Sequence, residues 1–251
     1  MEEIVLQLSG LSKRYEEKVV VDRINLKVSR GETIGLLGPN GAGKSTIINM
    51  IVGNIKPTLG SISLLGSEKN LSEARKRIGF VPQDLAVYSD LKVWENIELF
   101  AGLYGLTGTS LKEGINRVLQ MVDLEKEREM YVRNLSEGMK RRLNMACALT
   151  HSPELLIFDE PTVAIDPQSR RFILEKIREL NEKGCTILYT SHYMEEVEYL
   201  CQRIAILDRG KMIAVGTKDE LVDMVSNEND DELTLEEVFI RLTGKEFHLQ
   251  G

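Results

Sequence analysis

The stretch from residue 38 to residue 46 reads GPNGAGKST and has the residue types of a phosphate-binding loop. It matches the pattern G-x-x-x-x-G-K-[ST], between a continuously apolar segment at residues 33–37 and a predicted helix at Lys44–Val52. Three glycines let consecutive backbone N–H groups turn toward an anion, and the helix adds its positive N-terminal end. Lys44 can attract the β- and γ-phosphates of a nucleoside triphosphate, and the Ser45 hydroxyl can bind Mg²⁺. The predicted nucleotide-binding residues are Gly38, Pro39, Asn40, Gly41, Ala42, Gly43, Lys44, Ser45 and Thr46.

Two acidic residues end a second apolar segment, residues 155–158. Asp159 is predicted at the carboxyl end of a buried strand, where open α/β sheets bind ligands, and is placed to hold Mg²⁺. Glu160, one residue further along, can activate a water molecule. A purely structural Asp-Glu pair is the alternative, and the phosphate-binding loop disfavours it. The two motifs predict hydrolysis of a nucleoside triphosphate, and the lack of an N-K-x-D-like motif disfavours GTP.

Five shorter motifs accompany these two. They are LSEGM at residues 135–139, Asp166 before a proline, His192 after a serine that ends an apolar segment, Gln83 after Val-Pro, and Tyr15 after Lys-Arg. In their order along the chain, the seven motifs resemble those of the nucleotide-binding subunits of ABC transporters, over about residues 4–216. The five resemble the signature, the D-loop, the switch histidine, the Q-loop and the A-loop of that family.

The resemblance implies a role for each motif. Tyr15 would stack on adenine, which its flat amphipathic ring suits. Gln83 would contact Mg²⁺ or the attacking water, and His192 would hydrogen-bond the γ-phosphate. Ser136 and Gly138 would reach the γ-phosphate held by a second subunit, in a head-to-tail dimer with two-fold symmetry. The implied catalytic residues are Lys44, Gln83, Glu160 and His192; the further nucleotide-binding residues are Tyr15, Ser136, Gly138 and Asp166; the Mg²⁺ ligands are Ser45, Gln83 and Asp159.

Residues 90–105, 190–196 and 235–244 are similar to segments of single-ATPase exporters that pair with separate type-two permeases. This implies ATP and Mg²⁺ as cofactors, with an integral-membrane permease and a second ATP-binding subunit, identical or different, as partners. It also implies a place on the cytoplasmic face of the membrane, held through the permease, for a subunit that is soluble when isolated. Two alternatives stay open, a soluble non-transport ATPase of the same family and a binding module with impaired turnover.

Two residues depart from the family pattern. Glu137 stands where the signature usually has glycine, and Ala164 stands where the D-loop usually has glycine. Ala164 is expected to restrict φ and stiffen its loop. Glu137 is expected to place a negative charge where the family directs positive potential at a phosphate.

Hydrophobic patterning indicates the elements that position these residues. Residues 24, 26 and 28 are apolar and alternate with polar residues, as in a half-buried antiparallel strand, and residues 19–21 predict a separate strand before it. Strand and helix patterns alternate around residues 155–215, which predicts a parallel sheet, whereas residues 91–150 carry helical periodicity. We predict an α/β fold, a P-loop NTPase (RecA-like) core with an N-terminal antiparallel β subdomain and an inserted α-helical signature subdomain. The predicted domains are residues 1–87 with 154–217, the helical subdomain 88–153, and an acidic tail 218–251, in which a polar linker over 226–232 precedes a short helix.

Composition and charge disfavour several other classes of protein. The net charge is −7, and residues 218–251 hold ten acidic and three basic residues, so this segment accounts for all of it. The neutral remainder predicts no nucleic-acid partner. Three cysteines without C-x-x-C spacing predict neither a disulfide framework nor a zinc site. No apolar run approaches the roughly 20 residues of a membrane span, and the start, MEEIVLQL, predicts no secretory signal.

Overall fold

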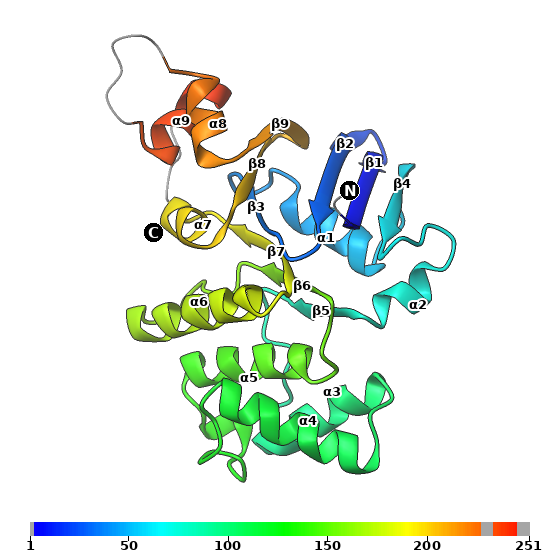
Figure 1. Ribbon diagram of the computed structural model, residues 1–251, viewed down its shortest axis with the longest axis vertical. Helices are drawn as coiled ribbons and strands as arrows, with labels where there is room; N and C mark the ends of the chain where they lie inside the picture. Colours follow the sequence, from blue (N-terminus) through cyan, green and yellow to red (C-terminus); the bar gives the residue numbers. More distant parts are fainter. Residues whose placement is uncertain (1–2, 227–232, 245–251) are drawn as a thin grey trace. The chain divides into compact units, whose positions relative to one another are not determined.

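The computed structural model describes residues 3–226 and 233–244 (Figure 1). The chain forms two compact units, the first from Met1–Ala74 with Thr186–Gly251 and the second from Arg75–Cys185. The boundaries of these units are set by the packing of the chain. The domain boundaries predicted above were set by the sequence motifs, and they stay a prediction. The predicted polar linker lies outside the described residues from residue 227 to residue 232.

The first unit contains a three-stranded antiparallel sheet. Its central strand β1 (Ile4–Tyr15) pairs with β2 (Lys18–Ser29) on one side and β4 (Leu59–Leu64) on the other. The apolar residues at 24, 26 and 28 are buried and the polar residues between them are exposed, which confirms the predicted alternation. The prediction of two separate strands, at residues 19–21 and 24–28, was wrong. Strand β2 continues through Arg23, which adopts a positive φ of 50° at a register shift.

A second sheet of the first unit runs in the order β7 (Thr186–Ser191), β3 (Thr33–Leu37), β8 (Arg203–Asp208) and β9 (Lys211–Gly216). The first three strands are parallel, as predicted, and β9 is antiparallel to β8. Every residue of β3 and β7 is buried, as expected for strands covered on both faces. The helices beside these strands are α1 (Lys44–Val52), α7 (Met194–Leu200), α8 (Lys218–Asp223) and α9 (Leu235–Thr243), and the short helix α2 (Leu71–Arg75) ends at the boundary of the unit.

The C-terminal helix α9 packs into the core of the first unit. Leu235, Val238 and Phe239 are buried together with Leu37 of β3 and Val197 of α7. The helix expected at residues 235–242 is therefore confirmed, and its apolar stripe packs against its own chain. Thr234 caps its first turn by accepting a hydrogen bond from the Glu237 N–H.

The second unit joins two parallel strands to a set of helices. Strand β5 (Ile78–Val81) pairs with β6 (Leu155–Asp159). Between them in the sequence lie α3 (Val93–Leu103), α4 (Gly108–Met121), a 3₁₀ turn (Val132–Asn134) and α5 (Glu137–Leu149), and α6 (Pro167–Glu182) follows β6. Helices α3, α4 and α5 contact one another, as the predicted helical insertion requires. Each helix in the described ranges is too short or too polar to cross a membrane.

Candidate nucleotide-binding site

The loop between β3 and α1 has the conformation that phosphate binding requires. Gly43 caps α1 with a φ of 106°, which a residue with a Cβ rarely adopts. At the other end of the loop, a Cβ added to Gly38 would lie 2.4 Å from the Leu207 carbonyl oxygen of β8, so only glycine fits there. The nine-residue helix α1 begins directly at Lys44. Its first N–H groups therefore lie at the end of the loop, as the sequence predicted.

The side chain of Lys44 lies inside this loop, where it could bind a polyphosphate. Its side chain is buried, and its ammonium group donates hydrogen bonds to the carbonyl oxygens of Gly38 (2.7 Å) and Pro39 (3.3 Å). The loop thus wraps around its own lysine, and a cation and a helix N-terminus lie in one short segment. Because both attract anions, the residues present fit the phosphate chain of a nucleotide. The half-buried Ser45 follows directly, and its hydroxyl is the hard oxygen donor that Mg²⁺ prefers.

Asp159 ends strand β6 in the second unit and Glu160 follows it directly, where the sequence placed them. Both residues are buried, with exposed fractions of 5% and 6%. Glu160 adopts a positive φ of 47°, so the chain turns sharply as it leaves the strand. Buried carboxylates at the carboxyl end of a parallel strand lie where open α/β sheets bind ligands, and their roles as metal ligand and general base stay predictions.

Gln83 is exposed just after β5, and its backbone is tied to the signature helix. The Arg141 guanidinium of α5 donates to the Gln83 carbonyl oxygen and to the Val163 carbonyl oxygen, the latter at 3.4 Å. Burial lowers the pKa of Arg141 from its ordinary value, whereas Glu137 and Asp84 act in the opposite direction. The contact of Arg141 with Gln83 was not predicted, and its signal in the sequence is the basic run at residues 140–142.

The starts of α5 and α6 meet within the second unit. Ser136 caps α5 by accepting a hydrogen bond from the Met139 N–H (3.2 Å), and Asp166 caps α6 by accepting one from the Ser169 N–H (2.9 Å). Hydrogen bonds from the Ser169 side chain and from the Ser169 backbone N–H lower the pKa of Asp166. Gly138 is buried between the two caps, and a Cβ added to it would lie 2.7 Å from the Ser169 Cβ. Gly138 therefore has a packing reason to be glycine within its own chain.

His192 follows β7 in the first unit, in a segment tied to a buried carboxylate. The Glu196 carboxylate of α7 accepts hydrogen bonds from the Tyr189 hydroxyl (2.8 Å) and the Ser191 hydroxyl (2.7 Å). The Tyr193 N–H donates to the Ser191 hydroxyl oxygen (2.9 Å), so both neighbours of His192 in the chain are fixed. Glu196 was not predicted as a site residue.

Tyr15 ends β1 with 46% of its surface exposed, as a stacking platform needs. The Lys13 ammonium group lies 4.9 Å from the centre of its ring. The predicted residues divide between the units. The first holds Tyr15, residues 38–46 and His192, and the second holds Gln83, Ser136, Gly138, Asp159, Glu160 and Asp166.

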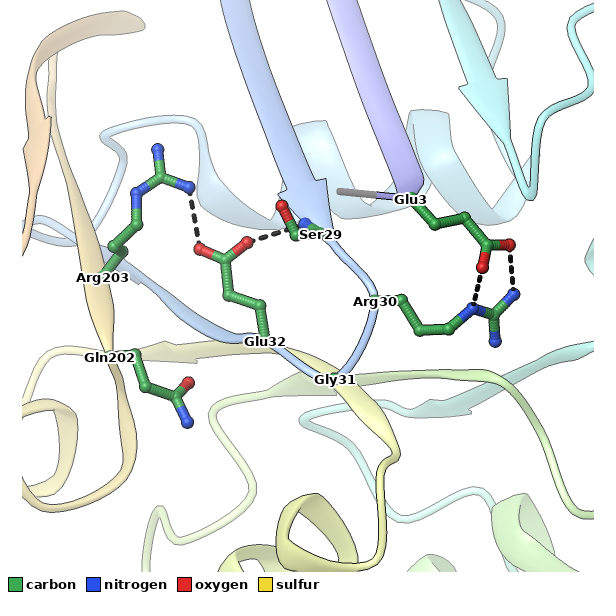
Figure 2. A pocket seen from close by; sticks show the side chains of 7 residues that line it. All are labelled: Glu3, Ser29, Arg30, Gly31, Glu32, Gln202 and Arg203. Atoms are coloured by element: carbon green, nitrogen blue, oxygen red, sulfur yellow. Dashed lines mark hydrogen bonds and ion pairs between the residues drawn. The ribbon is translucent and has the colours of Figure 1, made fainter. Parts of the chain in front are cut away.

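A separate hollow of about 440 Å³ opens at the opposite end of β3 from the phosphate-binding loop (Figure 2). Its charged side chains pair with one another. Arg30 pairs with Glu3 (2.7 Å), and Arg203 pairs with Glu32 (2.8 Å). Figure 2 shows both pairs, and the Glu32 carboxylate also accepts a hydrogen bond from the Ser29 N–H (2.7 Å). The paired residues lie at or next to the ends of strands, and none of the predicted nucleotide-binding residues lines the hollow.

A glycine-rich loop between a buried parallel strand and a helix, with a lysine at the start of that helix, defines a P-loop nucleoside triphosphatase. The α/β fold, with its antiparallel sheet and helical insertion, confirms the predicted fold class. Comparison with known proteins identifies the family. The family model described as "ABC transporter" matches residues 21–163. The chain belongs to the ABC transporter family, and it is an ATP-binding, ATP-hydrolysing subunit of that family.

Individual relatives agree with this assignment. The chain is 47% identical to the linearmycin resistance ATP-binding protein LnrL of Bacillus subtilis strain 168, over 92% of this chain and 75% of that protein. It is 42% identical to the Nod factor export ATP-binding protein I of Cupriavidus metallidurans, over 87% of this chain and 73% of that protein.

Two solved structures show the same fold. The structure of an ATP-binding subunit of an ABC transporter has a TM-score of 0.85 and 31% identity, and the match covers 95% of this chain and 99% of that one. A dimeric post-hydrolysis state of an ATP-binding cassette bound to ADP and Pi has a TM-score of 0.76 and 28% identity, covering 85% of this chain and 98% of that one.

Proposed function

We propose that this chain is the ATPase motor of an exporter, in which ATP binding closes a head-to-tail dimer and hydrolysis reopens it. The observation that carries the proposal is the buried Lys44 within a glycine loop at the start of α1. Relatives named for linearmycin resistance and for Nod factor export support the direction of transport.

The site residues divide the chemistry among them. Lys44 and the N–H groups at the start of α1 bind the phosphates, and Tyr15 stacks on adenine. Ser45, Asp159 and Gln83 are the oxygen donors that would hold Mg²⁺, which supplies positive charge to the phosphate oxygens when bound. Glu160 accepts a proton from the attacking water, and His192 hydrogen-bonds the γ-phosphate.

The partners follow from the same proposal. One partner would be a second ATP-binding subunit, identical or different, and Ser136 and Gly138 of this chain would contact the ATP bound to it. A dimeric relative bound to ADP and Pi supports such a pair. An integral-membrane permease would contact the segment after Gln83, where Leu85 and Val87 are half-buried and Tyr88 is 56% exposed. The permease would hold the subunit at the cytoplasmic face of the membrane. Co-purification of the chain with a membrane protein tests this part.

Substitution of the proposed general base tests the hydrolytic mechanism. Glu160→Gln keeps the shape of the side chain and removes its basicity, so we expect ATP binding to persist and turnover to fall by about 10²–10⁴-fold. ATP should then accumulate a dimer that is visible by size exclusion. Glu182→Gln on α6, which replaces an exposed carboxylate paired with Arg178 (3.0 Å), is the matched control and should hydrolyse ATP normally.

Three outcomes separate the alternatives. Normal hydrolysis by the Glu160→Gln variant would remove Glu160 from this role. Binding of ATP without hydrolysis by the wild-type chain would favour the binding module. Hydrolysis without any membrane partner on purification would favour a soluble ATPase.

A further inference from the structure

The turn that joins β8 to β9 is a tight hairpin. Asp208 and Lys211 pair across it, and the two residues between them, Arg209 and Gly210, have positive φ values of 46° and 77°. Two-residue hairpin loops with both φ values positive are type I′ turns, which favour glycine at the second position.

This turn contacts the phosphate-binding loop directly. The Gly210 N–H donates a hydrogen bond to the Ala42 carbonyl oxygen (2.9 Å), and the Gly210 carbonyl oxygen accepts one from the Asp22 N–H of β2 (2.8 Å). Gly210 therefore lies between the loop and β2. A Cβ added to Gly210 would lie 2.3 Å from the Val20 carbonyl oxygen, so a side chain at this position would force the turn to move.

The hydrogen bond from Gly210 fixes the orientation of one peptide group in the loop. In a trans peptide, the carbonyl and the N–H point in opposite directions. Because the Ala42 carbonyl points at Gly210, the N–H of Gly43 points away from the hairpin. An anion nest requires consecutive N–H groups to turn to one side, so a rotation of this peptide would remove one of the donors.

We propose that Gly210 is a positioning residue for phosphate binding. Its N–H holds the Ala42–Gly43 peptide in the orientation that presents the Gly43 N–H to phosphate, and its lack of a side chain lets the turn fit against β2. This rests on nucleotide binding by residues 38–46, and it adds a turn about 170 residues further along the chain to the residues that shape that loop.

A second hairpin of the first unit supplies a matched control. Leu65 and Gly66 have φ values of 50° and 76°, and Leu64 and Ser67 pair across them, as in the turn at Arg209 and Gly210. A Cβ added to Gly66 meets no atom within 4 Å. Gly66→Ala therefore introduces the same backbone strain without displacing a neighbour or affecting the loop.

The experiment compares Gly210→Ala, Gly66→Ala and the wild-type chain. Both variants should unfold at lower temperature than the wild type, because alanine is strained at positive φ. Only Gly210→Ala should weaken ATP binding, by about three- to tenfold, as expected for loss of one hydrogen bond. Titration calorimetry with ATP, at a temperature where each protein is folded, measures the dissociation constants.

A second measurement needs no variant. Hydrogen exchange of the wild-type chain reports the Gly210 amide, bonded to Ala42, and the Ser67 amide, which donates to the Leu64 carbonyl oxygen at 2.8 Å. Saturating ATP should slow exchange at Gly210 and leave Ser67 unchanged, since only the first bond holds the loop.

Two results would overturn the proposal. If the Gly210→Ala variant is less stable but binds ATP within twofold of the wild type, Gly210 only shapes its own turn. The same conclusion would follow if the Gly210 amide of the wild type exchanged at the same rate with and without ATP. Failure of the wild-type chain to bind ATP would overturn the nucleotide-binding function as well, which distinguishes the two failures.

Discussion

Two residues after β6 adopt a backbone conformation that usually belongs to glycine. Glu160 has a φ of 47° and Ala164 a φ of 60°. The left-handed region costs about 1–2 kcal/mol for a residue with a Cβ, so the segment between β6 and α6 is held by its surroundings. Part of that support comes from Arg141, which donates to the Val163 carbonyl oxygen (3.4 Å). Ala164, identified above as a departure from the family pattern, therefore stands where glycine would fit without strain.

Substitution of Ala164 by glycine tests this strain. The change should relieve about 1–2 kcal/mol in the folded state and lose about 0.4–1 kcal/mol through the greater freedom of the unfolded chain. The free energy of unfolding should therefore stay the same or rise by up to about 1.6 kcal/mol in urea titrations. Ala86→Gly, at an exposed loop residue without a positive φ, should lose about 0.4–1 kcal/mol. Equal losses in the two variants would show that Ala164 carries no strain.

At the scale of elements, hydrophobic patterning predicted the buried strands and the amphipathic helices. The apolar run at β3 and the helical spacing in α3 depend on residues close in sequence. Strand β4, which reads LGSISL, was not predicted, because Gly60 and two serines resemble a loop. It forms because Leu64 and Ile62 pair with Leu6 and Leu8 of β1, and such long-range pairing leaves no local pattern.

The same limit applied to the site. The residues within each motif could be predicted, because a glycine loop before a helix has a local physical reason. The contacts that hold the motifs in place could not be predicted, because they join residues far apart in the chain. Arg141 bonds the carbonyl of Gln83, 58 residues away, and Gly210 bonds Ala42. The roles assigned to the site residues stay predictions until the variants are measured.

The docked helix α9 makes the tail a contributor to stability. Phe239 is 2% exposed within the cluster that also contains Leu37, the residue before the phosphate-binding loop. Phe239→Ala should lower the free energy of unfolding by about 3–5 kcal/mol. Met224→Ala, at a side chain that is 57% exposed, should change it by less than about 0.5 kcal/mol in the same urea titration. Near-equal stabilities would mean that α9 does not pack on the core in solution.

At the scale of the whole molecule, the proposed dimer depends on the charge that each subunit presents to its partner. Glu137 begins α5 with 62% of its side chain exposed and pairs with Lys140 (2.7 Å). An acid in the first turn favours the helix by about 0.3–1 kcal/mol, and an exposed pair adds little. If the start of α5 faces the γ-phosphate of the partner, the same carboxylate repels it. After screening by solvent and by Lys140, this repulsion should be about 1 kcal/mol or less.

The dimer constant of Glu137→Gln separates these two effects. The variant removes the charge and keeps the size of the side chain, so ATP affinity of the single subunit should stay unchanged. In the Glu160→Gln background, where ATP persists, ATP-driven dimerisation should tighten by up to about fivefold at low salt, and its salt dependence should shrink. Sedimentation at two salt concentrations measures both quantities, with Glu175→Gln as the control, which replaces a half-exposed acid on α6 that pairs with Arg171. A dimerisation constant that does not change at low salt would mean that the Glu137 carboxylate faces water and stabilises only its own helix.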